Sequence, residues 1–214
     1  MNRKEAKELL NLHVTNLFPI PFMVHMLRDD DLADLVEEEF LKVEKDIPRI
    51  STHSDGNQYT NSDWDKIFSE GKDPIFNPIK IEGFMNELNL VRENFAKISG
   101  IQHNPNSLGF WTQDYVEEGD QHGRHNHGAQ GISGVYFIRA EKGCGELQFY
   151  NPNPYIEYCG LSENISKHNF FGMNTINIAP KKGLFILFPS YLQHAAQQNP
   201  AGIKRTVFAF NYEN

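Results

Sequence analysis

A β-strand pattern is plain near the end of the sequence, in Lys204-Arg205-Thr206-Val207-Phe208-Ala209-Phe210-Asn211-Tyr212. In a β-strand, successive side chains point to opposite faces, so this segment has one aromatic face and one small, mostly apolar face. The small face holds Arg205, Val207, Ala209 and Asn211, and the aromatic face holds Thr206, Phe208, Phe210 and Tyr212. The aromatic face can seal a sheet layer. A guanidinium at the end of the small face suits a carboxylate ligand inside a barrel, although a structural ion pair is the alternative role of Arg205.

Short segments of the same kind follow one another from about residue 108 onward. They are rich in β-branched and aromatic residues and are bounded by Gly, Pro or Asn, as strands are. The expected strands are 108–116, 132–140, 145–150, 174–179, 183–188 and 204–212. Such an array predicts a jelly-roll or a related double sheet. We expect a hairpin turn at residues 142–145, between the second and third strands.

The first half of the chain has a different pattern. Apolar residues at helical spacing predict helices at 3–12, 31–41 and 81–98. Prolines at 19 and 21 before an apolar run suit an edge strand within 17–27, and residues 48–80 read as loop. We therefore expect a mainly β protein with N-terminal α helices: one structural domain, with residues 1–107 as a helical and loop support region and 108–214 as the β core. The irregular stretch 151–173 is long enough for a lid or binding loop.

Composition narrows the classes of partner. Among 214 residues, Lys and Arg number 20 and Asp and Glu 28, a net charge of −8 that disfavours nucleic acid or an anionic membrane as the main partner. No apolar run approaches the ~18 residues that span a bilayer. The two cysteines lack metal-type spacing, so we expect free thiols and a cytoplasmic location. No feature indicates an oligomeric state.

Three of the nine histidines lie in one segment, residues 119–130, at positions 122, 125 and 127. Alternate residues of a strand share a face, so His125 and His127 can direct both imidazoles into one cavity, as a metal ion requires. His194, just after the apolar strand 183–188, is the candidate third ligand. Neutral imidazole suits iron, zinc, copper or nickel, so the histidines alone do not name the ion. A solvated, histidine-rich loop is the alternative.

The order of these motifs resembles the Fe(II)/2-oxoglutarate oxygenases of the prolyl-hydroxylase-like superfamily, especially the branch with HxH, SGVYY, LFPSWLxH and RxxxxFN segments. The matching segments here are HxH at 125–127, SGVYFI at 133–138, GELQFYNP at 145–152, INIAPKKGLFILFPSYLQH at 176–194 and RTVFAFN at 205–211. The resemblance covers residues 108–212, about half of the chain. It implies a double-stranded β-helix, the jelly-roll variant, whose mouth holds Fe(II) with 2-oxoglutarate chelating the metal.

The resemblance also implies roles for individual residues. His125 would be the first metal ligand and His194 the distal one, and Arg205 would pair with the far carboxylate of 2-oxoglutarate. Further residues would line the co-substrate pocket. These are Trp111, Gln113 and Tyr115 on strand 108–116, with Ser133 and Tyr136 on the next strand.

Position 127 departs from the usual H-x-D pattern of the superfamily. A site of three histidines binds through neutral ligands and keeps the full +2 charge of the metal, instead of +1 with a carboxylate, so anionic co-substrates would be held more strongly. His122 is a candidate substitute ligand whose face depends on a bend at Gly123. Val207 stands where many relatives have a hydroxyl residue, which removes one hydrogen bond to 2-oxoglutarate.

The sequence therefore predicts an Fe(II)- and 2-oxoglutarate-dependent dioxygenase that hydroxylates a small-molecule or peptide substrate and converts 2-oxoglutarate and O₂ to succinate and CO₂. Two alternatives stay open. One is a three-histidine, cupin-like dioxygenase without 2-oxoglutarate, in which Arg205 would serve another acid. The other is a non-catalytic module that binds a metal, or a partner through the 151–173 loop.

Overall fold

The computed structural model of the chain describes residues 19–47, 49–51, 58–61, 75–128, 131–153 and 173–214. Its elements in chain order are β1 (Met23–Met26), α2 (Asp30–Val43), η1 (Glu44–Asp46), β2 (Arg49–Ser51), β3 (Gln58–Asn61), η2 (Pro78–Lys80), α4 (Phe84–Ser99), β4 (Leu108–Tyr115), β5 (His122–His125), β6 (Ile132–Ala140), β7 (Leu147–Tyr150), β8 (Thr175–Ile178), β9 (Leu184–Pro189), β10 (His194–Ala196) and β11 (Arg205–Tyr212). The predicted helix 3–12 and most of the 151–173 loop lie outside these residues. None of the helices described is long and apolar enough to cross a membrane.

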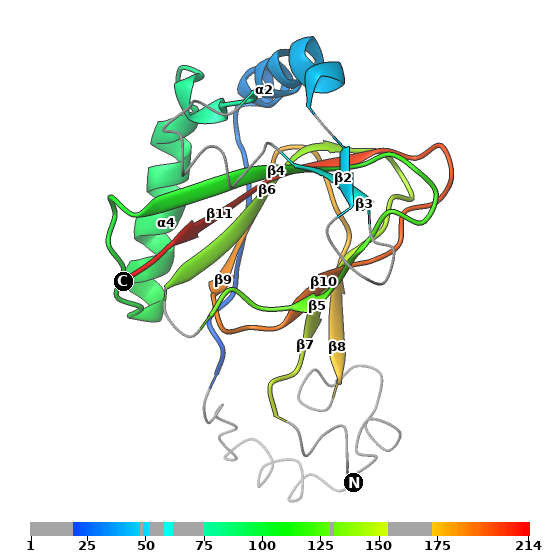
Figure 1. The fold of residues 1–214 in the computed structure, drawn as a ribbon. Coiled ribbons are helices and arrows are strands. Elements are labelled where there is room, and N and C mark those ends of the chain that lie inside the picture. Colours follow the sequence, from blue (N-terminus) through cyan, green and yellow to red (C-terminus); the bar gives the residue numbers. More distant parts are fainter. Residues whose placement is uncertain (1–18, 48, 52–57, 62–74, 129–130, 154–172) are drawn as a thin grey trace, which may run out of the picture.

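The strands form two antiparallel sheets that face each other (Figure 1). The larger sheet has the strand order β1-β9-β6-β11-β4-β3-β2, and the smaller has the order β5-β10-β7-β8. Most neighbouring strands are distant in sequence; β10, for example, lies between β5 and β7. This double sheet preceded by helices is the mainly β, double-stranded β-helix architecture that the sequence predicts.

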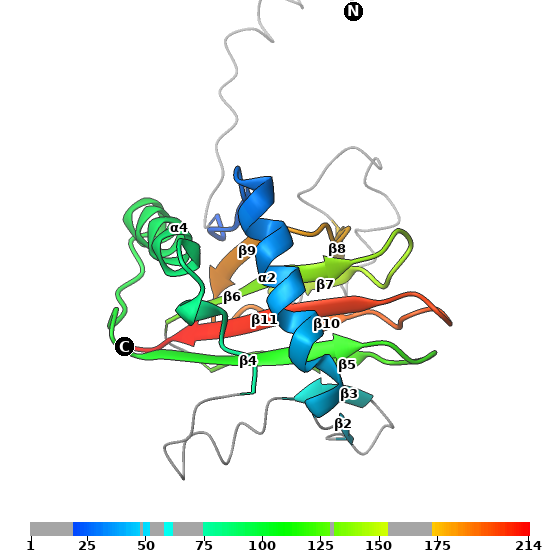
Figure 2. The same cartoon turned by 90° about the horizontal axis from the view of Figure 1, so that it is seen from above.

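Helices α2 and α4 lie on the outer face of the larger sheet (Figures 1 and 2). The α2 helix begins after Asp29, whose side chain accepts a hydrogen bond from the backbone N–H of Leu32 at 3.1 Å. The α4 helix ends at Gly100, which adopts the left-handed conformation (φ 72°) that glycine reaches without strain. Both helices bury an apolar stripe against the sheet, as their helical spacing predicts.

The two faces of β11 belong to two different cores. Phe208 and Phe210 pack toward the helices, where the ring centroid of Phe84 lies 5.6 Å from that of Phe208. Val207 and Ala209 pack in the second core, between the two sheets. The alternation predicted for residues 204–212 is therefore confirmed. Burial of each aromatic ring contributes roughly 1.5–3 kcal/mol to the stability of the fold. Because its two faces pack in different cores, β11 stabilises both.

Two predictions about the connections are wrong. Residues 48–80 are not all loop, because β2 pairs with β3 and β3 pairs with β4 at the edge of the larger sheet. The turn at 142–145 does not close a hairpin, since β6 and β7 belong to different sheets. At Gly145 the chain crosses between the sheets so closely that an added Cβ would lie 2.3 Å from the carbonyl oxygen of Gln197. Only glycine fits that crossing.

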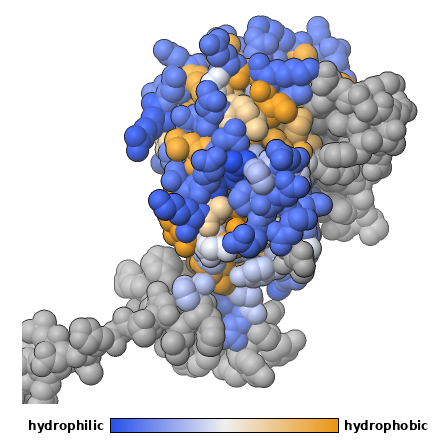
Figure 3. Space-filling model, turned by 90° about the vertical axis from the view of Figure 1, so that its left-hand side faces the viewer, coloured by the Kyte–Doolittle hydropathy of each residue, from blue (hydrophilic) through white to orange (hydrophobic). Residues whose placement is uncertain are grey.

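The first half of the chain contributes to the same sheet as the second half, because β1, β2 and β3 join strands from residues 108–214. The strand predicted within 17–27 is β1, which among the described strands pairs with β9 alone at the sheet edge. A division at residue 107 stays a prediction. The face that carries α4 is mostly hydrophilic with scattered apolar side chains (Figure 3), as is usual for a protein surface.

Candidate active site

Three histidines meet between the two sheets. In the pairing of β5 with β10, His194 lies directly opposite His125. His127 follows β5, and its backbone N–H donates to the carbonyl oxygen of Ser190 at 2.9 Å. One ring nitrogen from each of these histidines lies within 4.8 Å of those of the other two. The structure thus brings together the three histidines that the sequence selects, in an arrangement that can hold a metal ion.

Hydrogen bonds fix which nitrogen of each ring faces the cluster. The Nδ1 atom of His125 lies 2.7 Å from the carbonyl oxygen of Gly123, and that of His194 lies 3.0 Å from the carbonyl oxygen of Leu192. A carbonyl oxygen only accepts, so both Nδ1 atoms carry the proton and donate. A neutral ring that carries its proton on Nδ1 has a lone pair on Nε2, which is the form that binds a metal.

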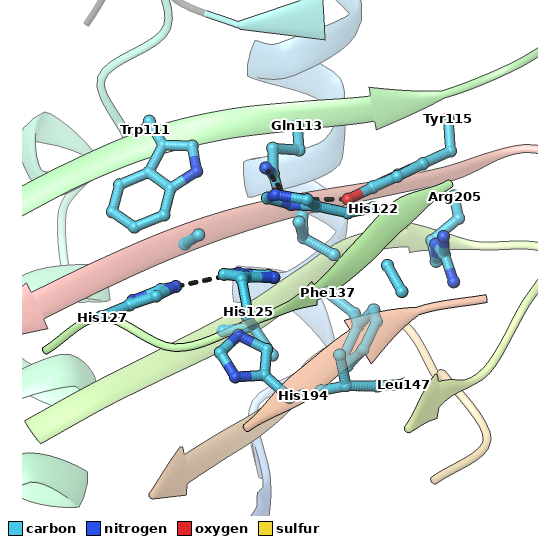
Figure 4. A pocket seen from close by; sticks show the side chains of 14 residues that line it. Trp111, Gln113, Tyr115, His122, His125, His127, Phe137, Leu147, His194 and Arg205 are labelled. Carbon is cyan, nitrogen blue, oxygen red and sulfur yellow. Dashed lines mark hydrogen bonds between the residues drawn. The ribbon is translucent and has the colours of Figure 1, made fainter. Parts of the chain in front are cut away.

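His127 also donates a hydrogen bond from Nδ1, but its acceptor is a side chain. Its Nδ1–H donates to the Oδ1 atom of Asn211 at 2.7 Å, and its Nε2 lies 3.1 Å from the Nε2 of His125 (dashed line in Figure 4). One ring can donate Nε2–H to the other here when it is protonated, and when both rings are neutral two Nε2 lone pairs face each other. In the neutral form, a metal cation can bind both nitrogens.

The protonation of the rings agrees with this role. His194 is only 4% exposed, and burial lowers its pKa well below the usual range, with His125 and His127 adding to the effect. Burial also lowers the pKa of His127, against the opposing effect of the hydrogen bond that its ring donates to Asn211. Both rings are therefore neutral near pH 7, as metal ligands must be.

The histidines form one end of a cavity between the sheets (Figure 4). The remaining wall comes mainly from β4, β6, β7, β10 and β11, through Trp111, Gln113, Tyr115, Val135, Phe137, Leu147, Ala196, Arg205, Val207 and Ala209. In the register of β11 with β4, Trp111 lies opposite Ala209 and Tyr115 opposite Arg205. The middle of the cavity is thus largely apolar, with imidazoles at one end and a guanidinium at the other.

Arg205 is 1% exposed at the end of the cavity away from the histidines. Its guanidinium donates to the carbonyl oxygens of Gly145 and Gln197, and its carbon Cζ lies 4.1 Å from the ring centroid of Tyr115. Its Nε–H has no hydrogen-bond partner, and no carboxylate among the described residues forms an ion pair with it. A buried guanidinium stays charged, and leaving it without a counterion costs several kcal/mol. An anionic ligand would remove that cost.

A polar chain runs along the wall between the two ends. The hydroxyl of Tyr115 donates to Oε1 of Gln113 at 3.1 Å, and Nε2 of Gln113 donates to Nδ1 of His122 at 3.0 Å. The ring of His122 stacks on that of His125, with centroids 3.9 Å apart and planes at 14°. His122 therefore lies beside the three-histidine cluster and is not one of its members.

The two residues predicted on β6 lie on opposite faces of that strand. The hydroxyl oxygen of Ser133 lies 2.7 Å from Oδ1 of Asn211, next to His127. Tyr136 packs instead against Phe84 and Phe185 on the helix side of the sheet, so its predicted contact with the co-substrate is wrong. The reason is strand geometry, because residues three apart in a strand point in opposite directions.

Several residues of the site were not predicted. Val135 and Phe137 of β6 line the cavity in place of Tyr136, and the two-residue alternation that starts at Ser133 would have identified them. Asn211 was placed on the correct face of β11, but nothing local to its sequence shows that it reaches His127. Ser190 gives no signal of its own before the fold is known.

Comparisons with known proteins agree with this geometry. Residues 109–211, just under half of the chain, match the family model described as "Putative 2OG-Fe(II) oxygenase". No curated protein matches the sequence.

Solved structures share the fold at low sequence identity. A prolyl-4-hydroxylase from Pseudomonas putida aligns over 91% of this chain and 93% of its own, with a TM-score of 0.60 and 13% identity. A prolyl hydroxylase from Trichoplax adhaerens, solved with a hypoxia inducible factor peptide fragment, aligns over 98% and 91%, with a TM-score of 0.60 and 13% identity. The non-heme alpha ketoglutarate dependent epimerase SnoN from nogalamycin biosynthesis aligns over 91% and 79%, with a TM-score of 0.60 and 10% identity.

The family match falls on the strands that carry the three histidines and Arg205. The segment that matches this family model is the double-stranded β-helix core of the structure, and the solved structures share that fold.

Proposed function

We propose that the protein is an Fe(II)- and 2-oxoglutarate-dependent dioxygenase whose metal is held by His125, His127 and His194. This proposal rests on one cavity with ring nitrogens of three histidines at one end and, at the other, a buried guanidinium that forms no ion pair with any described residue. A metal and a dicarboxylate together complement both ends.

The histidines fit Fe(II) by their chemistry. Imidazole nitrogen is an accepted ligand of Fe(II), and three such ligands leave open positions for a co-substrate and O₂. Imidazole ligands bind a metal as neutral rings, so three of them would not offset the charge of the ion. The metal end of the cavity then attracts anionic groups more strongly than a site with one carboxylate ligand would.

Arg205 and the apolar wall fit 2-oxoglutarate. Its keto acid end would lie at the metal, and its other carboxylate would accept hydrogen bonds from the guanidinium of Arg205. Val207 and Ala209 lie between the two ends on β11, where they can contact the methylene groups of the co-substrate. The ring of Tyr115 lies against the Arg205 guanidinium, and its hydroxyl points away from it and donates to Gln113.

When bound, Fe(II) and 2-oxoglutarate would supply the oxidative chemistry, in which O₂ and 2-oxoglutarate yield succinate, CO₂ and a hydroxylated substrate. The residues of this chain bind, orient and enclose the reactants. Trp111 and His127, whose ring centroids lie 5.5 Å apart, line the cavity at the end opposite Arg205, and we propose that the substrate approaches there. The substrate would be a small molecule or a peptide. Cys144 is free and buried.

Formation of succinate from 2-oxoglutarate, measured with and without Fe(II) and without added substrate, tests this function. We expect slow, Fe(II)-dependent conversion by the wild type and none by His194→Ala. Conversion that is independent of Fe(II), or the absence of both conversion and 2-oxoglutarate binding, would contradict the proposal. Metal binding without any effect of 2-oxoglutarate would instead favour a three-histidine dioxygenase that uses another acid.

A further inference from the structure

Three motifs of the sequence each place one polar side chain beside His127. Ser133 is the first residue of SGVYFI, Ser190 follows Pro189 in the FPS segment, and Asn211 ends RTVFAFN. In the register of β6 with β11, Ser133 lies directly opposite Asn211. The hydroxyl oxygen of Ser133 lies 2.7 Å from Oδ1 of Asn211 and 2.9 Å from the hydroxyl oxygen of Ser190.

This network ends on one nitrogen of His127. The Oδ1 atom of Asn211 accepts the Nδ1–H of His127 at 2.7 Å and the hydroxyl hydrogen of Ser133. Ser190 also accepts the backbone N–H of His127 through its carbonyl oxygen at 2.9 Å. Ser133 and Ser190 are 0% and 2% exposed, so water does not compete readily for these bonds. The Ser133 hydroxyl, which lies 3.2 Å from Nδ1 of His127 itself, therefore holds Oδ1 of Asn211 as the shorter acceptor of the His127 proton.

His127 differs in this respect from the other two histidines. His125 and His194 each donate to the backbone carbonyl of the residue two positions earlier, Gly123 and Leu192. A backbone acceptor of this kind remains when the side chain at position 123 or 192 is changed. His127 depends on a side chain from another strand. An aspartate at position 127 would have no tautomer to fix, so the need for an acceptor arises because this chain has histidine there.

We propose that Asn211, oriented by Ser133 and Ser190, is a positioning residue that holds the proton of His127 on Nδ1 and so presents Nε2 to the metal. This inference rests on the proposed metal site. Acceptors of this kind typically change metal affinity by 10–100-fold when removed, because they set both the tautomer and the orientation of the ring.

The Nδ1–H protons of histidines bound to Co(II) give a direct test. In the Co(II)-loaded protein in H₂O, these protons give shifted NMR resonances that disappear in D₂O. We expect three such resonances for the wild type, one for each histidine. In Asn211→Leu, the resonance of His127 should be lost through rapid exchange, while the other two persist. In Asn211→Asp, which keeps an acceptor, all three should remain. Three unchanged resonances in Asn211→Leu would overturn the proposal.

Affinity for Co(II) supplies a second readout that does not depend on NMR assignment. Asn211→Leu should bind Co(II) about 10–100-fold more weakly than the wild type, and Asn211→Asp should bind within a few-fold of it. Asn177→Leu is the matched control, because Asn177 is an exposed amide on β8 that accepts a hydrogen bond from Gln148 away from the cavity. Equal affinities for all three variants would contradict the proposal.

A double variant separates a positioning role from a general effect on folding. In a His127→Asp background, Asn211→Leu should have little effect on Co(II) affinity, because no ring at position 127 needs an acceptor. The same loss in both backgrounds would assign Asn211 a structural role only. If the wild type shows no exchangeable histidine resonances with Co(II), the metal site itself is contradicted, and this proposal with it.

Discussion

His194 lies directly opposite His125 in the antiparallel pairing of β10 with β5. These strands are three and four residues long, and a register break follows His194 before Ala196. Two of the three candidate ligands are therefore brought together by a short, irregular ladder. A metal bound by both would connect the strands that carry them, so metal binding and the stability of the smaller sheet should be linked.

The first prediction follows from that link. Saturating Co(II) or anaerobic Fe(II) should raise the melting temperature of the chelator-treated wild type, because a ligand that binds only the folded state stabilises it. At a metal concentration of about 100 times Kd, the gain is about 2.7 kcal/mol. Differential scanning fluorimetry measures the shift. His194→Ala should show none, and an equal shift in that variant would place the metal elsewhere.

Replacing His127 tests its place among the ligands. His127→Asp should retain Fe(II), because a carboxylate oxygen from the same position is also a suitable ligand, and the charge of the metal with its ligands falls from +2 to +1. Anionic 2-oxoglutarate should then bind modestly more weakly. His127→Ala should retain less iron than His127→Asp. Metal analysis after desalting measures both, and equal iron in wild type and both variants would show that His127 is not a ligand.

The lowered pKa of His194 predicts how the metal-free protein responds to pH. Burial depresses this pKa in the folded state, whereas an unfolded histidine titrates near 6.5. Below that pH, the unfolded chain binds a proton that the folded chain does not, so the stability present above about pH 6.5 is lost as the pH falls. The melting temperature of the apoprotein should therefore fall between about pH 7.5 and pH 5.5.

His194→Leu provides the control for that pH dependence. The variant lacks the titrating ring, so its melting temperature should fall less over the same range, whatever its value at neutral pH. An identical slope for the variant and the wild type would show that His194 is not buried as a neutral ring.

A separate prediction concerns the side of the larger sheet that faces α2. Arg139, 6% exposed, pairs with the 4% exposed Asp114 at 3.0 Å and with Glu44 at 2.7 Å. Arg139→Met leaves the buried carboxylate of Asp114 without its cation, which should lower the free energy of unfolding by about 3–5 kcal/mol. The double variant Arg139→Met/Asp114→Leu should recover much of this loss in urea unfolding. A single variant as stable as the wild type would mean that Asp114 is not ionised.

The sequence predicts the long elements of this fold better than the short ones. The alternation of β11 and the apolar spacing of α2 are local patterns, and each decides which face is buried. In contrast, β5 has the sequence HGRH and β10 has HAA, which carry no apolar alternation. These strands form because their neighbours offer hydrogen-bond partners, which is information that only the assembled sheet contains.

The same distinction, between local sequence patterns and contacts that depend on the fold, applies to the residues of the site. His125, His127, His194 and Arg205 are residue types whose chemistry is visible in the sequence, and the fold gathers them in one cavity. The acceptor for His127 comes from a strand 84 residues later in the chain. No local pattern connects the two, so Asn211 could be recognised only from the register of β11. Tyr136 was misplaced for a different reason, since the spacing from Ser133 already puts it on the opposite face.

Anaerobic titration of the Fe(II) protein with 2-oxoglutarate tests whether one cavity binds both metal and co-substrate, because chelation of the iron by the keto acid gives a visible charge-transfer absorption. The wild type should develop this absorption with one 2-oxoglutarate per iron. Arg205→Lys keeps the charge but loses the planar guanidinium, so its affinity should fall by about 1–3 kcal/mol, whereas the matched control Arg139→Lys, outside the cavity, should bind as the wild type does. A wild type that binds one iron but gives no such absorption, or an Arg205→Lys curve identical to that of the wild type, would contradict the account.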